Sequence, residues 1–306
     1  MAGPAAFIKQ VHAPTGVTHC AVAHFTLLDA RGNLPDLIVT TSSLLQLYSV
    51  REQQSVTKGY QLLLRAECQL FGVVESMAVL KNRAAGKQRD AIILAFRDAK
   101  VSVLDWDASS CSVVSTSLHS FEGDANISAG LPASPYGPRL LSDPQGRCAA
   151  VLLGRSSVAV LPAMTTDTLD EMVLGAGPSA GQQGLPTTVG NSCILRLAKH
   201  DIAEVRDAVF LHRYSEPVLL VLHETAPTWS GNLRARRDTM AATALSVNVL
   251  HKRLTLLWSA KDLPSDACRL HAAPLGGALV MCRSLIKYIS QASRELTVSF
   301  IFQLQA

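Results

Sequence analysis

Short apolar runs separated by a few polar residues recur along the chain. Residues 36–40 and 44–50 flank a polar turn at 41–43, and residues 91–96 and 100–106 flank a turn at 97–99. Two further pairs have the same form, residues 148–153 with 157–161 and residues 277–282 with 285–289, and residues 218–223 with 240–249 form a fourth pair along the chain with a long tip. Apolar runs of this length around short turns are typical of β-hairpins. The pattern therefore predicts an all-β protein.

The hairpins recur at a nearly constant spacing. Their first residues, 36, 91, 148, 218 and 277, are 55, 57, 70 and 59 positions apart. Further strand candidates lie between the hairpins, which gives about four strands in each repeat and is typical of β-propeller blades. We predict a β-propeller with about five to six four-stranded blades, an incomplete form of a seven-bladed ring.

The repeats extend along the whole chain, so residues 1–306 are expected to form a single propeller domain. One step between hairpins is longer because it contains a segment rich in Gly, Ser and Thr at about residues 165–192. This composition is typical of flexible linkers, and the segment is predicted to be an insertion. The apolar run at 298–304 would form an open sheet edge, which is a further reason to expect an incomplete propeller.

The composition excludes several classes of protein. Hydrophobic residues make up 48% of the chain and charged residues 17%, which excludes a disordered protein. The longest apolar runs reach about six residues, whereas a membrane-spanning helix needs about 18, so a soluble chain is expected. The seven cysteines form no C-x-x-C pair. They are predicted to be reduced thiols, mostly buried in strands, and to form no zinc site.

No catalytic constellation is apparent in the sequence. Residues 177–181 match G-x-S-x-G, which would make Ser179 a nucleophile. That motif requires a strand before the serine and a helix after it, and here it lies in the predicted flexible insertion. The histidines are scattered without metal-ligand spacing. We expect no enzyme activity, no catalytic or metal-binding residues and no cofactor.

Two clusters of basic residues are candidate contacts for RNA or for a protein partner. Lys81, Arg83, Lys87 and Arg89 fall between two predicted strands. Arg234, Arg236 and Arg237 lie at the tip of the long fourth hairpin, near Trp229. Arginine can bind phosphate through two hydrogen bonds and tryptophan can stack on a base. The alternative is that both loops are solvated or contact a partner protein, and the net charge of +4 supports only a weak role for RNA.

Several segments together resemble the N-terminal propeller of the largest subunit of the cleavage and polyadenylation specificity factor. The longest are RDAIILAFRDAKVSV at 89–103 and DPQGRCAA at 143–150. The shorter matching segments are residues 12–16, 76–78, 117–122, 216–217, 228–229, 237–239, 263–264 and 274–277. Their order and spacing match from about residue 8 to about residue 290. The same superfamily includes the large damaged-DNA-binding subunit and a splicing-factor subunit.

The resemblance implies the N-terminal one of three propellers and a nuclear scaffold in pre-mRNA 3′-end cleavage and polyadenylation. In that family the large subunit holds a WD-repeat subunit and a zinc-finger subunit, which read the polyadenylation signal. The endonuclease is a different subunit, so the family implies no catalytic residue here. We expect at most weak direct contact with RNA, and contact with pre-mRNA that is indirect. The alternative within the superfamily is a propeller scaffold of a DNA-damage-binding ubiquitin ligase or of a splicing factor.

Overall fold

The fold of the chain is taken from a computed structural model. The structure describes residues 15–26, 34–53, 59–81, 89–97, 99–123, 139–164, 188–227, 229–235, 237–292 and 296–299. Ser179 and most of the predicted insertion at 165–192 lie outside these residues.

Twenty strands of the described chain form five four-stranded antiparallel sheets, which we call blades 1 to 5. Blades 1 and 2 contain β1 (His19–Ala23), β2 (Asp36–Thr40), β3 (Leu44–Gln53), β4 (Gly59–Gln69), β5 (Val74–Leu80), β6 (Ala91–Phe96), β7 (Lys100–Asp107) and β8 (Ser112–Ser120). Blade 3 contains β9 (Arg139–Ser142), β10 (Cys148–Leu153), β11 (Ser157–Pro162) and β12 (Cys193–Arg196). Blades 4 and 5 contain β13 (Glu204–Phe210), β14 (Val218–Glu224), β15 (Met240–Asn248), β16 (Arg253–Leu263), β17 (Arg269–Ala272), β18 (Ala278–Met281), β19 (Leu285–Ile289) and β20 (Leu296–Ser299).

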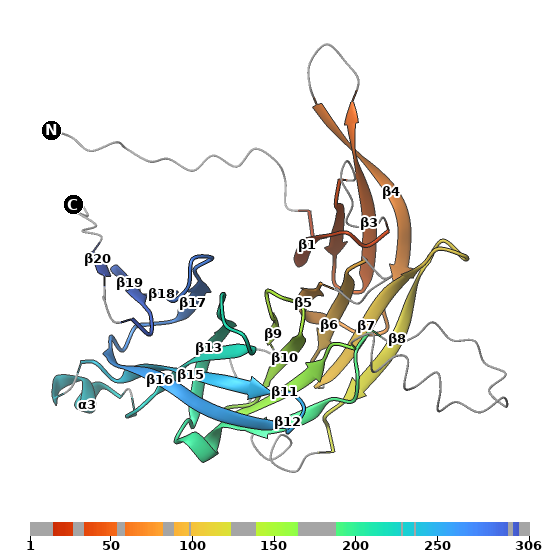
Figure 1. The fold of residues 1–306 in the computed structure, drawn as a ribbon. Coiled ribbons are helices and arrows are strands. Elements are labelled where there is room, and N and C mark those ends of the chain that lie inside the picture. The colour runs from red at the N-terminus through yellow and green to blue at the C-terminus, as the bar shows by residue number, and fades with distance from the viewer. Residues whose placement is uncertain are drawn as a thin grey trace, which may run out of the picture.

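Within each blade the strands pair in the order in which they occur along the chain. The first strands, β1, β5, β9, β13 and β17, contact one another in sequence, so they form the inner side of the arrangement. The blades follow an open arc, with blade 1 and blade 5 at its two ends (Figure 1). This is the architecture of an incomplete β-propeller, which confirms the predicted fold class.

The hydrophobic core lies between the blades. Ile93 and Val101 of blade 2 pack with Val151 and Leu161 of blade 3, and all four side chains are fully buried. The middle strands of blades 2, 3 and 4 are covered on both faces, because a neighbouring blade packs against each face. This explains why they appear in the sequence as continuous apolar runs rather than as an alternating pattern.

Three short strands, β9, β12 and β17, were not predicted by the hydrophobic pattern. Residues 195–205 form the end of β12, a short 3-10 helix η1 (Leu197–His200) and the start of β13. The prediction of mostly buried cysteines was wrong, because only Cys148 is buried, whereas Cys20, Cys111 and Cys268 are exposed. The cysteines are all free thiols.

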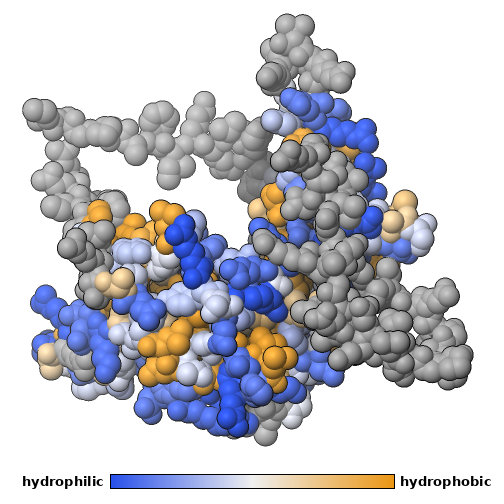
Figure 2. All heavy atoms as spheres, in the orientation of Figure 1, coloured by the Kyte–Doolittle hydropathy of each residue, from blue (hydrophilic) through white to orange (hydrophobic). Residues whose placement is uncertain are grey.

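The outer strands carry much of the exposed apolar surface. On β4, Tyr60, Leu62 and Leu64 are exposed, and on β16 the same is true of Leu256 and Leu257. Figure 2 shows hydrophobic side chains gathered on the face in view, over the region of β11, β15 and β16, and bordered by hydrophilic ones. None of the helices in the described part of the chain has the length and hydrophobicity needed to cross a membrane.

Candidate interaction surfaces

The order of the strands places the connections of each blade on two opposite faces. Successive strands are antiparallel, so the turn between the first and second strands lies at the opposite end from the turn between the second and third. Face 1 is the face that carries the turn between the first and second strands of each blade. Face 2 is the face that carries the turn between the second and third strands. In Figure 1 the face-1 turns of blades 3, 4 and 5 project to the same side of the arc. Loops on such faces are where propellers carry function.

The structure separates the two predicted basic clusters. Lys81 follows β5 and Arg89 precedes β6, so both lie on face 1. Trp229, Arg234 and Arg237 lie between β14 and β15 on face 2, with Arg234 in the short helix α3 (Ser230–Ala235). Arg83, Lys87 and Arg236 lie outside the described residues. The two clusters therefore belong to opposite faces and do not form one basic surface.

On face 2, Trp229 borders a pocket of about 490 Å³. Trp229 is 63% exposed. The other lining residues are Ala203, Glu204, Glu224, Thr225, Ala226 and Pro227. Both carboxylates in this lining are already bound by arginines, Glu204 by Arg155 at 2.8 Å and Glu224 by Arg206. The charges beside Trp229 therefore compensate each other, and the hypothesis that this loop contacts RNA stays a prediction.

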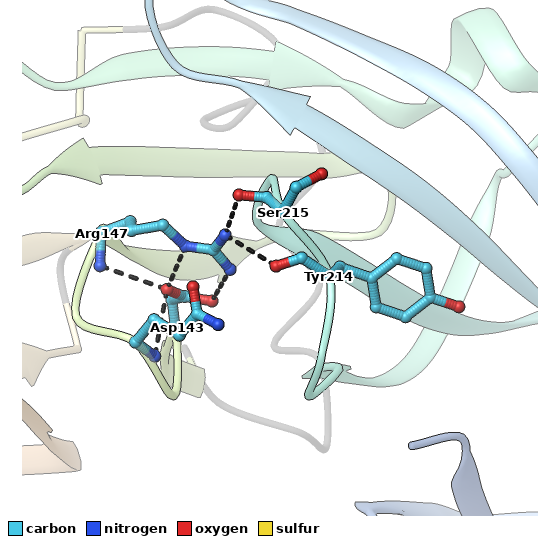
Figure 3. Close-up of polar contacts among 5 residues, drawn as sticks. Asp143, Arg147, Tyr214 and Ser215 are labelled. Carbon is cyan, nitrogen blue, oxygen red and sulfur yellow. Dashed lines mark hydrogen bonds and ion pairs between the residues drawn. The ribbon is translucent and has the colours of Figure 1, made fainter. Parts of the chain in front are cut away.

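On face 1, Arg147 forms an ion pair within the turn of blade 3 and also contacts the turn of blade 4 (Figure 3). Arg147 Nε donates to Asp143 Oδ2 at 2.8 Å, and Arg147 Nη2 donates to Asp143 Oδ1 at 2.8 Å. Arg147 Nη1 also donates to the backbone carbonyl oxygens of Tyr214 and Ser215 in blade 4. The bidentate geometry holds the guanidinium in one orientation. The pair therefore fixes the turn of blade 3 against the turn of blade 4.

The same turn also contacts blade 2 through Gly146. Its φ of +73° is one that side chains rarely allow, and a Cβ there would lie 2.0 Å from the carbonyl oxygen of Lys81. Only glycine lets the two backbones approach this closely. Gly146 and Arg147 together fix the relative positions of the face-1 turns of blades 2, 3 and 4.

These turns enclose a pocket of about 430 Å³ on face 1. Blades 2 to 5 all contribute to its lining: Val79, Lys81, Ser142, Asp143, Pro144, Gln145, His212, Arg213 and Pro274. Lys81 and Arg213 are exposed, and Arg213 has a left-handed backbone with φ +67°. The negative charge of Asp143 is compensated by Arg147, so the pocket has an excess of positive charge.

Sequence reasoning marked Lys81 as a candidate contact but missed His212 and Arg213. It used residues 143–150 only as a mark of family and assigned Asp143 and Arg147 no role. The available signal was the order Asp-Pro-x-Gly-Arg, in which proline and glycine set a tight turn between a carboxylate and a guanidinium. The partners of that turn, at 81 and 212–215, are too distant in sequence to be inferred from it.

The inner strands are joined by buried polar groups. Asp207 of β13 is fully buried and pairs with Arg139 of β9. Its Oδ2 also accepts a hydrogen bond of 2.7 Å from the backbone N–H of Leu270 in β17. A buried carboxylate must be paired in this way, because leaving it without partners is costly. Asp207 therefore links blades 3, 4 and 5.

One chain of polar side chains inside blade 4 could suggest catalysis. His223 Nε2 lies 2.9 Å from Thr243 Oγ1, which lies 3.0 Å from Ser259 Oγ. Burial lowers the pKa of His223 below its ordinary value of 6.5. The residue His223 is 5% exposed and lies on β14 between two paired strands, so its side chain is a buried part of blade 4. Within the described residues, no cluster of three or more His, Cys, Asp and Glu is arranged to hold a metal ion.

Five four-stranded blades with inner strands in contact define a β-propeller of the type that offers binding faces to other molecules. Residues 16–301 match the family model described as the RSE1/DDB1/CPSF1 first beta-propeller, and the chain belongs to this family.

Individual relatives give a narrower comparison than the family as a whole. The chain is 34% identical to cleavage and polyadenylation specificity factor subunit 1 of Arabidopsis thaliana, over 93% of this chain and 23% of that protein. It is 30% identical to the protein of the same name in Drosophila melanogaster, over 95% of this chain and 21% of that protein. Protein cft1 of Aspergillus niger is 29% identical, over 94% of this chain and 23% of that protein. The chain spans less than a quarter of the length of these relatives.

Proposed function

We propose that this chain acts as a non-enzymatic scaffold in the nuclear machinery that cleaves and polyadenylates pre-mRNA. The observation that carries the proposal is the match of residues 16–301 to the first propeller of the RSE1/DDB1/CPSF1 family, together with relatives named as subunit 1 of the cleavage and polyadenylation specificity factor. Function within one fold varies, so the family alone leaves the splicing and DNA-damage alternatives open. The names of these relatives favour the polyadenylation machinery.

The surface of the described chain supports a role in protein binding. Tyr60, Leu62 and Leu64 expose an apolar row on β4, and Trp229 is exposed on face 2. Exposed aromatic and aliphatic side chains of this kind are enriched at protein interfaces. We propose that the partners are other subunits of the machinery, among them a WD-repeat subunit and a zinc-finger subunit. Contact with pre-mRNA is proposed to be weak or indirect.

We further propose that residues 1–306 form one propeller domain that is incomplete as it stands, with an insertion at about 165–192. The described chain supplies five blades, and blades 1 and 5 lie at the two ends of the arc (Figure 1). The apolar side chains of β4 lie in blade 1, at one end of that arc. Further blades or a partner subunit would cover such surfaces in the assembled complex.

Affinity purification from nuclear extract tests the proposal. The tagged protein, in its native genomic context, is expected to recover subunits of the polyadenylation machinery, identified by mass spectrometry. The matched control carries Leu62→Asp and Leu64→Asp on β4, which should reduce recovery at least fivefold if this apolar row binds a partner. Recovery of ubiquitin-ligase or splicing-factor subunits in place of polyadenylation subunits would overturn the proposal.

A further inference from the structure

The pocket on face 1 has the features of a prepared binding site. Its walls come from four successive blades, and its volume of about 430 Å³ is sufficient for two or three side chains of a bound segment. Gly146 and the Asp143–Arg147 pair hold the surrounding turns in fixed positions. A site that is rigid before binding loses little conformational entropy when it is occupied.

The charge of the pocket selects an anionic ligand. Lys81 and Arg213 line it and are exposed, and the imidazole of His212 adds a further hydrogen-bonding group. Asp143, the one carboxylate among the lining residues, accepts hydrogen bonds from the Arg147 guanidinium at both oxygens and from the backbone N–H groups of Gln145 and Arg147 at Oδ2. The field inside the pocket is therefore positive, which attracts carboxylate or phosphate groups.

Arg213 takes its place in the pocket lining with an uncommon backbone conformation. Its φ of +67° is uncommon for a residue other than glycine, asparagine or aspartate. A side chain held in this region of conformational space costs about 1 kcal/mol or more, and such residues cluster at binding sites. Ala99, Cys111 and Lys252 share this conformation elsewhere in the described chain, so it is the place of Arg213 in the pocket lining that points to a role for its charge.

The remaining lining residues favour a peptide over a nucleic acid. Proteins that bind single-stranded nucleic acid stack successive bases on several aromatic side chains, whereas the nine lining residues include no Phe, Tyr or Trp and one imidazole, that of His212. Val79, Pro144 and Pro274 instead offer aliphatic surfaces beside the cations. This combination suits an extended segment in which Asp or Glu alternates with aliphatic residues.

We propose that the face-1 pocket binds an acidic peptide segment of a partner protein. Lys81 and Arg213 bind its carboxylates, and Pro144 and Pro274 pack against its aliphatic side chains. The proposal goes beyond membership of the polyadenylation machinery, because it would hold for a partner from any complex.

Fluorescence anisotropy with the full 306-residue chain tests the proposal. The probe is a fluorescein-labelled peptide of alternating Glu, Leu and Pro, and the matched peptide carries Gln in place of Glu. Lys81→Gln with Arg213→Asn is expected to weaken binding of the Glu peptide about tenfold and to flatten its salt dependence, because two charged contacts are lost. The Arg155→Gln and Arg234→Gln variant removes two positive charges on face 2 and should bind as the unmodified chain does.

Three outcomes would overturn the proposal. They are equal binding of the Glu and Gln peptides, no loss of affinity in the face-1 variant, and tighter binding of a ten-nucleotide uridine RNA that is lost in the same variant. Circular dichroism checks that the double variant is folded. Lys81→Gln alone, which changes an exposed side chain outside any strand, provides a second measurement and should weaken binding about threefold.

Discussion

At the scale of single residues, the turn at 143–147 shows how side-chain chemistry fixes one blade relative to the next. Gly146 permits contact with the backbone of Lys81, and Arg147 binds both Asp143 and the carbonyl groups of blade 4. Gly154, in the face-2 turn of the same blade, has a similar φ of +60° but nothing within 4 Å of its Cβ position. Alanine at position 154 would therefore carry only the cost of the backbone conformation, whereas alanine at position 146 would also carry the cost of a steric clash.

Gly146→Ala is expected to destabilise the protein by about 3 kcal/mol, because the strain of a left-handed alanine adds to a clash with the Lys81 carbonyl. Gly154→Ala carries only the conformational cost of about 1 kcal/mol. Urea unfolding followed by circular dichroism measures both. If the two variants lose the same free energy of unfolding, the alanine Cβ at position 146 does not clash with the Lys81 carbonyl.

At the scale of strands, the hydrophobic pattern was sufficient to predict a strand that is buried on both faces and flanked by turn residues. The middle pairs, such as β6 with β7 and β10 with β11, meet both conditions and were predicted. The inner strands β9 and β17 are four residues long and begin with Arg139 and Arg269, so no apolar run marks them. Arg139 is tolerated there because Asp207, 68 positions later in the sequence, neutralises it.

The binding surfaces could be predicted less well than the strands. Charge alone identified Lys81 and the arginines near Trp229, but it could not show that they lie on opposite faces. The face-1 pocket gathers side chains from positions 79 to 274, and only the closure of successive blades brings them together. The local sequence around each residue does not indicate contacts with residues that are far away along the chain.

Blade 4 contains a titratable group whose burial makes stability depend on pH. Burial lowers the pKa of His223 from 6.5, so the folded chain binds a proton at this site less readily than the unfolded chain does. The stability associated with neutral His223 is complete above pH 6.5 and is lost as pH falls toward the lowered pKa. His223→Gln should therefore show a smaller loss of stability between pH 7 and pH 5 than the unmodified chain.

Thermal unfolding at several pH values measures this difference. His271→Gln serves as the control, since His271 is exposed on β17. If the His223→Gln variant and the unmodified chain lose stability in parallel as the pH falls, the imidazole of His223 is not the group responsible.

At the scale of the whole molecule, a few buried charges join separate sheets into one structure. Asp207 is in contact with Arg139 of blade 3 and with the backbone of Leu270 in blade 5. By contrast, Lys100 and Glu122 form an ion pair at 3.0 Å in which both side chains are nearly half exposed. Solvent weakens such a surface pair, whereas removing one member of a buried pair leaves an uncompensated charge.

Asp207→Asn is expected to destabilise the protein by about 3 kcal/mol, because Arg139 is left without its counter-charge. Glu122→Gln should cost about 0.5 kcal/mol or less. Urea unfolding gives both free energies, and hydrogen exchange should show faster opening of β9, β13 and β17 in the Asp207 variant. A loss below about 1 kcal/mol would contradict the role of Asp207 as the link between the three blades.

The order of strands within the blades has a consequence for synthesis of the chain. Each described sheet is formed by one contiguous stretch of sequence, and no described blade takes a strand from another. A blade therefore has all its hydrogen-bonding partners as soon as its own segment has left the ribosome. When a new sheet forms, the apolar face of the preceding blade is already present for it to pack against. The arc is therefore expected to assemble in the direction of translation.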